Sequence, residues 1–312
     1  MRIHTDIESI EGIQRPVLTI GTFDGVHLGH KVIIDRLNEI AAQENGESVL
    51  LTFHPHPRIV VQEAASIELL TTMDERLALL REAGLQHVII HPFTKEFSRI
   101  SALAYVRDLL VNQIGVHYAV VGYDHHFGRN REGDIHLFHE LAEVYGFKVE
   151  EISAQTIKEV KVSSTKVRNA LREGNLQMVR SYLGYDYSMK GTVVKGDGRG
   201  TGIGFPTANI LPDDQDKLIP AQGVYAVRVT LEGGEGYIGM MNIGTRPTFI
   251  SDLKDIKLEV HLLEFTGNLY GQQIHVCFVS HIRGEMKFEN VERLKAQLVK
   301  DRENVIGLMK DH

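Results

Sequence analysis

Short apolar runs alternate with amphipathic stretches over residues 17–152, and this alternation constrains the fold more than any other feature. Strands are expected at 17–21, 49–53, 88–91, 119–122 and 148–152, with helices at 29–42, 74–83, 102–113 and 135–145. Strands that alternate with helices form a parallel sheet with right-handed crossovers. Ligands of such sheets bind beyond the carboxyl ends of the strands. We therefore predict a Rossmann-like α/β domain whose binding residues follow its strands.

The pattern changes near residue 187 to short β-rich runs separated by turns. Strands are expected at 224–231, 237–241, 256–263 and 274–280, which predicts a small antiparallel β-barrel. A charged helix over residues 290–309 ends the chain. Its apolar side chains are expected to pack on the barrel: Val291, Leu294, Leu298 and Val305. The predicted domains are residues 1–184 and 185–312.

Composition excludes several classes of protein. The 312 residues are 43% hydrophobic, which is enough for buried cores, and the net charge of −7 argues against a large nucleic-acid surface. A single cysteine, Cys277, rules out an internal disulfide or a cysteine-based zinc site, and we expect a buried structural thiol. Because we find neither a signal peptide nor a long apolar run in the sequence, we expect a cytoplasmic protein without membrane contact. Self-association is left open.

The first candidate site lies where the first strand meets the first helix. Residues 21–30 read Gly-Thr-Phe-Asp-Gly-Val-His-Leu-Gly-His, so His27 and His30 sit at a helix N-terminus. Such a terminus presents free N–H groups to anions, and glycines let the backbone approach a phosphate. The histidines can add donors or positive charge to a phosphoryl group in transfer. The alternative is that both rings merely pack on the turn. The candidate ATP-binding residues here are Gly21, Phe23, Asp24, Gly25, His27 and His30.

A second helix opens at residues 163–168, Ser-Ser-Thr-Lys-Val-Arg. Its hydroxyls and free N–H groups can hold a phosphate chain, and Arg168 lies one turn further on. Taken alone, the segment is typical of a serine N-cap with a solvated arginine. Beside the histidine turn, it predicts the other half of a triphosphate site formed by Ser163, Ser164, Thr165 and Arg168.

Two further loops follow strands. Residues 54–57, His-Pro-His-Pro, form either a pocket wall or a simple rigid turn. Residues 122–133 combine Asp124, His125, His126 and Phe127 with two arginines. Adjacent histidines lack the spacing of a helical metal pair, so this loop is expected to contact an anionic, aromatic ligand.

The second half carries a glycine-rich stretch, residues 191–204, which we interpret as a phosphate-binding loop. It lacks the Gly-Lys-Ser/Thr ending of a P-loop. Thr207 and Asn209 alternate, so both oxygens face one side of an extended chain and suit Mg²⁺ beside ATP phosphates. Glu259 lies on a strand and is either a solvent-facing residue or a general base. The candidate ATP-binding residues here are Gly191, Lys195, Gly196, Gly200, Gly204, Phe205 and Thr207.

With these motifs in this order, the chain resembles the bacterial bifunctional riboflavin kinase/FMN adenylyltransferase (FAD synthetase) family over about residues 15–310. The first half is similar at residues 21–30, 52–57, 122–133 and 163–168, and the second at 204–210, 223–225, 242–249 and 259–265. The Pro-Thr-Ala-Asn and Arg-Pro-Thr-Phe segments make the match specific. One departure lies at His125 and His126, where an aromatic and a variable residue are expected.

The resemblance implies FMN formation from riboflavin and ATP, then FAD formation from FMN and ATP, both with Mg²⁺. His27 and His30 would stabilise the α-phosphate of ATP in adenylyl transfer, while Ser164, Thr165 and Arg168 hold its other phosphates. Thr207 and Asn209 would bind Mg²⁺·ATP in the kinase, and Glu259 would take the proton of the ribityl 5′-hydroxyl. The implied flavin-binding residues are His54, Asp124, Phe127 and Arg246.

Two alternatives remain at this point. The histidine turn alone also fits a nucleotidyltransferase for another phosphorylated acceptor, although such an enzyme does not need the barrel motifs. A non-catalytic flavin- or nucleotide-binding module would lack at least one charged or metal-binding group, yet the expected groups are all present.

Overall fold

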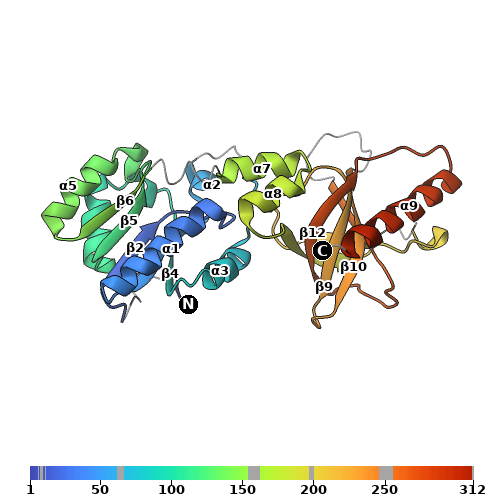
Figure 1. Ribbon diagram of the computed structural model, residues 1–312. Helices are drawn as coiled ribbons and strands as arrows, with labels where there is room; N and C mark the ends of the chain where they lie inside the picture. The colour runs from blue at the N-terminus through green and yellow to red at the C-terminus, as the bar shows by residue number, and fades with distance from the viewer. Residues whose placement is uncertain are drawn as a thin grey trace. The chain divides into compact units, whose positions relative to one another are not determined.

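The computed structural model describes residues 1–5, 7, 10, 12–61, 67–153, 162–196, 200–245 and 256–310. The chain forms two compact units, Met1–Ser164 and Thr165–His312, and each is described by itself (Figure 1). The functional boundary that we place after residue 184 stays a prediction. None of the described helices is both long and apolar enough to cross a membrane.

The first unit contains a six-stranded sheet in the order β1-β4-β3-β2-β5-β6, and all its pairs are parallel. The strands are β1 (Arg2–His4), β2 (Pro16–Ile20), β3 (Glu47–His54), β4 (His87–Pro92), β5 (Tyr118–Gly122) and β6 (Lys148–Ile152). The predicted parallel sheet and its five predicted strands are confirmed. β1 was not predicted, because its three residues include two charged or polar side chains and form no apolar run.

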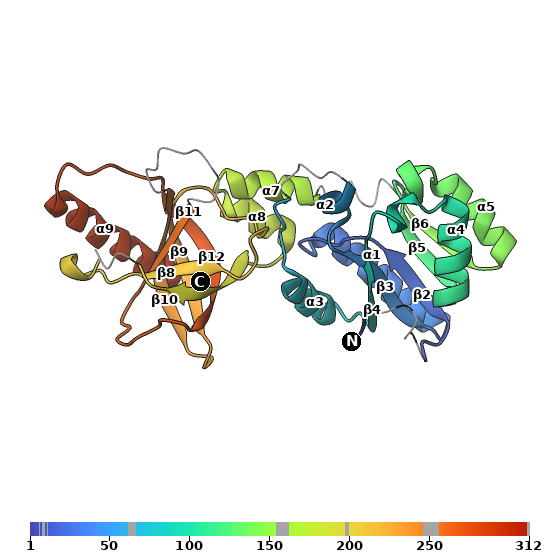
Figure 2. The same ribbon diagram turned by 180° about the vertical axis from the view of Figure 1, so that it is seen from behind.

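Helices cover both faces of this sheet (Figure 2). They are α1 (Leu28–Gln43), α2 (Pro57–Val61), α3 (Met73–Glu82), α4 (Ala102–Ala104), the π-helix η3 (Tyr105–Ile114) and α5 (Ile135–Tyr145). Successive residues of β2 point to opposite faces: Val17 packs in one core with α1 and α3, and Leu18 in another with η3 and α5. The four predicted helices are present, although the one expected over residues 102–113 is mostly a π-helix.

The second unit contains a closed antiparallel barrel in the order β10-β11-β8-β7-β12-β9. Its strands are β7 (Ser188–Val194), β8 (Ala208–Pro212), β9 (Gly223–Leu231), β10 (Gly236–Thr245), β11 (Ile256–Leu262) and β12 (Gln273–Arg283). The predicted barrel is confirmed. The prediction that the glycine-rich loop begins at residue 191 is wrong, because Gly191 pairs with Ile274 and with Pro212 inside β7. A Cβ at Gly191 would lie 2.5 Å from Ile210 Cγ2, so glycine allows a close approach of β8.

Among its described residues, the second unit also contains three α-helices: α7 (Ser164–Arg172, in this unit from Thr165), α8 (Leu176–Leu183) and α9 (Val291–Lys310). Leu298 and Val305 of α9 pack with Phe205 against the barrel, as expected. The expectation for Val291 is wrong, because its side chain is 55% exposed and the packed residues lie further along the helix. Arg283 of β12 donates three hydrogen bonds to the fully buried Asp301 carboxylate of α9, which ties the helix to the barrel.

Candidate functional site

The predicted histidine turn joins β2 to α1 at the centre of the sheet. β3 pairs with one side of β2 and β5 with the other, so the turn lies at the point where the strand order reverses, the usual ligand site of such sheets. His27 is the N-cap of α1, and its Nδ1 accepts a hydrogen bond of 3.2 Å from the His30 backbone N–H. An accepting Nδ1 carries no proton, so His27 is neutral with its ring proton on Nε2.

The two imidazole rings of the turn stack on each other. The centroids of His27 and His30 lie 3.6 Å apart at 10°, and Phe23 stacks on the other face of His30 at 4.6 Å. Burial lowers the pKa of His30 well below its ordinary value, and the neighbouring His27 and Arg76 lower it further. Both rings are therefore neutral near pH 7. Of the two functions that the sequence left open, hydrogen-bond donation rather than positive charge fits this geometry.

The backbone of the turn is strained. Phe23 and Val26 have φ values of 47° and 35°, in the left-handed region that a β-branched residue rarely adopts, while Gly25 reaches 85° without that cost. A Cβ at Gly21 would lie 2.9 Å from the Phe23 ring. Strain of this kind costs about 1–3 kcal/mol per residue and collects at functional sites, where surrounding contacts must hold it.

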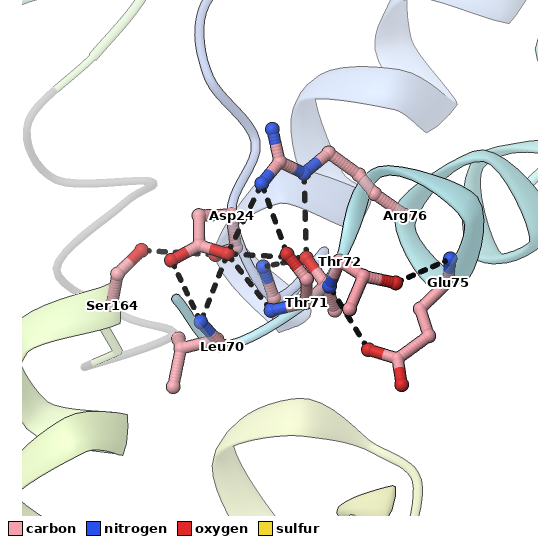
Figure 3. Close-up of polar contacts among 8 residues, drawn as sticks. Asp24, Leu70, Thr71, Thr72, Glu75, Arg76 and Ser164 are labelled. Carbon is pink, nitrogen blue, oxygen red and sulfur yellow. Dashed lines mark hydrogen bonds and ion pairs between the residues drawn. The ribbon is translucent and has the colours of Figure 1, made fainter. Parts of the chain in front are cut away.

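Asp24 lies in the middle of this strained turn with 1% of its surface exposed. Its carboxylate accepts hydrogen bonds from the backbone of Leu70, the backbone and hydroxyl of Thr71, and the Arg76 guanidinium (Figure 3). The predicted ATP contact of Asp24 stays a prediction, and these bonds favour a supporting role for the carboxylate. Sequence reasoning missed Thr71 and Arg76, because pairing across about fifty residues leaves no local signal.

Ser164 of the second predicted segment belongs to the first unit and contacts the histidine turn there. Ser164, the first residue of α7, donates a hydrogen bond of 3.1 Å from its hydroxyl to the Asp24 backbone carbonyl (Figure 3). The predicted start of a helix at residues 163–168 is confirmed. Thr165 and Arg168 follow in the first turns of that helix, and Ser163 is exposed just before it.

The loop at residues 122–133 closes on itself. Phe127 and Gly133 exchange two backbone hydrogen bonds of 3.1 and 2.9 Å, and the Phe127 ring is buried. His125 stacks on Phe127 at 5.6 Å and meets the edge of Phe138 at 5.3 Å. Burial lowers the pKa of His125 to about 4, so a neutral imidazole occupies the place expected for an aromatic ring.

The predicted flavin-binding residues have different environments. Asp124 and His54 are exposed at the carboxyl ends of β5 and β3, whereas Phe127 is buried in the aromatic cluster just described. Arg246 lies outside the described residues. The flavin contacts of all four residues stay predictions.

In the barrel, the strand register brings two of the predicted kinase residues, Asn209 and Glu259, into one row. Asn209 of β8 lies directly opposite Glu259 of β11, and Asn242 of β10 lies opposite Glu259 on its other side. Side chains directly opposite each other on neighbouring strands are about 5 Å apart and share a face. The alternation expected in β11 is confirmed, because Leu258 and Val260 are buried while Glu259 is partly exposed. Asn242 is the member of this row that the sequence analysis assigned no role.

Glycines let the loop before β8 lie against the Thr207 and Asn209 side chains. A Cβ at Gly196 would collide with the Asn209 amide. A Cβ at Gly200 would collide with the Phe205 carbonyl and lie 3.3 Å from the Thr207 hydroxyl. The backbone at Gly196 and Gly200 thus lies next to the Asn209 amide and the Thr207 hydroxyl, whose neutral oxygens are of the kind that a small hard cation accepts.

Other candidate residues of the barrel complete this picture. Glu259 forms an ion pair of 2.8 Å with Lys257, two residues away on the same face, and this contact orients the carboxylate. Gly204 has a φ of 83°, so it turns the chain into Phe205, whose ring is buried against α9. Lys195 is exposed at the start of the loop. The ATP contacts of these residues stay predictions.

In comparisons with known proteins, the two halves of the chain match two different family models, in agreement with its division into two units. The model of the FAD synthetase family matches residues 10–166, and that of the riboflavin kinase family matches residues 183–308. The chain is 38% identical to the bifunctional riboflavin kinase/FMN adenylyltransferase of Listeria monocytogenes, over 92% of this chain and 90% of the relative. It is 40% identical to the enzyme of the same name from Escherichia coli K12, over 91% of this chain and 90% of the relative. The relative from Buchnera aphidicola is 34% identical over 98% of both chains.

A solved structure shares the fold over almost the full length. It is described as a macrolide-efflux protein from Streptococcus pneumoniae, superimposes with a TM-score of 0.86, and is 27% identical over 97% of each chain. The similarity covers both the sheet unit and the barrel unit.

Proposed function

The chain belongs to the family of bifunctional riboflavin kinases/FMN adenylyltransferases, and from this premise we propose which of its residues carry each reaction. The protein phosphorylates riboflavin to FMN with ATP and then transfers an adenylyl group from ATP to FMN, giving FAD and pyrophosphate. Both family matches and the bifunctional relatives oppose the alternatives of another acceptor and of a non-catalytic module.

For adenylyl transfer, His27 and His30 donate hydrogen bonds to the α-phosphate of ATP. The N-cap contact of His27 supports this role, because it leaves Nε2 as a hydrogen-bond donor at the N-terminus of α1. An FMN phosphate oxygen attacks the α-phosphorus, and the bond from that phosphorus to the pyrophosphate oxygen breaks. Because the nucleophile is already an anion, no general base is needed, and positioning with charge stabilisation supplies the catalysis.

The remaining ATP contacts of this site follow the family motif. We assign Ser164, Thr165 and Arg168 to the β- and γ-phosphates, which leave as pyrophosphate. The hydrogen bond from the Ser164 hydroxyl to the Asp24 carbonyl supports this assignment for Ser164, since both residues lie in the first unit. His54, Asp124, Phe127 and Arg246 are proposed to form the flavin side.

For the kinase reaction, Glu259 accepts the proton of the ribityl 5′-hydroxyl while that oxygen attacks the γ-phosphorus of ATP. The bond between the γ-phosphorus and the bridging oxygen breaks, and ADP leaves. The register that sets Glu259 opposite Asn209 supports this role, because it places the base beside the proposed phosphate and metal ligands. The loop from Lys195 to Gly204 covers the phosphates through its backbone N–H groups.

The donor set beside that loop fits Mg²⁺. Thr207 and Asn209 offer neutral oxygens on one side of the chain, and the backbone at Gly196 and Gly200 lies close to their side chains. When bound, Mg²⁺ would neutralise charge that develops on the ATP phosphates. We also propose a cytoplasmic location, where riboflavin and ATP are both supplied.

The test exploits the presence of two reactions on one chain, because each serves as the folding control of the other. Glu259→Ala should abolish FMN formation from riboflavin and leave FAD formation from added FMN intact. His27→Ala should do the reverse. Chromatography of the flavins measures both, and an equal loss of both activities in either variant would contradict the assignment of separate sites.

A further inference from the structure

A buried polar network lies beneath the histidine turn, and the reaction scheme above gives it no role. Asp24, Thr71 and Arg76 are 1%, 3% and 3% exposed. They come from three parts of the chain: the turn after β2, the segment before α3, and the second turn of α3 (Figure 3). Burying a charged pair is costly unless both partners are fully hydrogen-bonded.

The Thr71 hydroxyl connects the other members of this network. It donates to Asp24 Oδ1 at 3.1 Å and accepts from the Gly25 backbone N–H at 3.0 Å and from Arg76 Nε at 3.3 Å. One donor and two acceptor positions are all that a hydroxyl has. The Gly25 backbone, two residues before His27, is therefore held through Thr71 by Arg76.

Arg76 closes the network from α3. Its Nη2 contacts Asp24 Oδ1 at 3.3 Å and the Thr71 carbonyl at 3.2 Å, so one guanidinium spans both partners with two nitrogens. A lysine has the charge but only one nitrogen, so it cannot make these bonds together in the same geometry.

We propose that Arg76 is a positioning residue for adenylyl transfer, which through Asp24 and Thr71 holds the strained turn that presents His27 and His30. The proposal rests on the roles of the two histidines proposed above. Phe23 and Val26, on either side of the Asp24–Gly25 pair, have left-handed φ values. Such conformations persist only where surrounding contacts determine them fully, and the hydrogen bonds to Asp24 and Gly25 are those contacts.

The charge of Arg76 has a second effect on the site. Together with burial and with His27, it lowers the pKa of His30 and so keeps that ring a neutral donor. Among the described residues, the titratable groups that shift the pKa of His30 are His27 from the same turn and Arg76 from α3, and Arg76 is itself paired with the Asp24 carboxylate. Removing the guanidinium should raise the pKa of His30.

The experiment compares Arg76→Met with Arg81→Met in the full-length chain. Arg81 is an exposed arginine of the same helix and is the matched control. Misplacing reacting groups by about 1 Å costs roughly 100-fold in rate, so kcat for FMN adenylylation should fall by about that factor in Arg76→Met. Riboflavin kinase activity on the same chain and both activities of Arg81→Met should stay at the wild-type level. NMR titration of the histidine rings should show His30 protonated at higher pH.

Arg76→Lys separates positioning from stability. It keeps the buried charge, so a lowered kcat for adenylylation at wild-type thermal stability supports the proposal. Wild-type kcat in Arg76→Lys and Arg76→Met, with His27→Ala inactive, would overturn the role of Arg76 and leave the proposed function standing. Full adenylylation by His27→Ala would instead refute the proposed function itself.

Discussion

The half-buried His125, whose ring lies among aromatic side chains, should make the first unit sensitive to acid, and His125→Phe should remove that sensitivity. The ring packs between Phe127 and Phe138, and its Nε2 is enclosed without a hydrogen-bond partner among the described residues. Burial disfavours the charged form and lowers its pKa to about 4; the Asp124 carboxylate raises the pKa by a smaller amount, and His126 lowers it slightly further. Phenylalanine suits the aromatic surroundings and has no proton to gain.

The direction and size of the effect follow from proton linkage. Because the pKa of His125 is about 4 in the folded chain and 6.5 when exposed, the unfolded chain binds more protons between these values. The free energy of unfolding therefore falls as the pH is lowered through this window. With these pKa values, His125 lowers the free energy of unfolding by about 0.2 kcal/mol at pH 7 and by about 2 kcal/mol at pH 5.

The assay is urea unfolding at pH 7 and pH 5, followed by hydrogen exchange of peptides from residues 122–138, which report on this unit alone. When the pH is lowered from 7 to 5, the free energy of unfolding of the wild type should fall by about 1.8 kcal/mol more than that of His125→Phe. His126→Phe, which removes the exposed neighbouring histidine of the same loop, is the matched control. A difference below about 0.5 kcal/mol between wild type and His125→Phe would refute the reasoning.

Three further predictions concern the barrel. Gly196→Ala should reduce FMN formation and spare FAD formation from added FMN, because the new methyl group displaces the Asn209 amide; unchanged kinase kinetics would contradict this placement. Arg283→Met removes the ion-pair partner of the buried Asp301 carboxylate, which keeps only the Gln297 hydrogen bond, and should cost the barrel about 3–5 kcal/mol of stability, measured as a lower thermal midpoint of kinase inactivation. Burial raises the pKa of Cys277 to about 11, so it should react slowly with a disulfide reagent at pH 8 and quickly in urea; fast labelling of the native protein would show an accessible thiolate.

The sequence predicted the fold class because periodicity is local. The alternation of apolar runs and amphipathic stretches required a parallel sheet, and the β-rich second half required an antiparallel barrel. Strand ends then located the histidine turn and the loop at residues 122–133 without knowledge of contacts. Where the local pattern was weak, prediction was less complete: the short β1 was missed, and Gly191 of β7 was interpreted as a loop residue.

Within the candidate sites, the sequence determined which residue types stand at a strand end or on one face of a strand. It placed His27 and His30 at a helix start, and Thr207 and Asn209 on the same side of an extended chain. Only the tertiary structure decided their surroundings. The N-cap contact of His27 set its tautomer, and the register of β8 against β11 brought Glu259 opposite Asn209.

The tertiary structure also decided which polar groups are buried. Asp24 is 52 residues from Arg76 in the chain, so no periodicity links them, yet they share one buried network. His125 is neutral because aromatic rings enclose it and lower its pKa. Val291 is exposed because the residues of α9 that pack on the barrel lie further along the helix. A sequence determines its elements through neighbours a few residues apart, whereas burial and charge depend on the segments that folding brings to the same place.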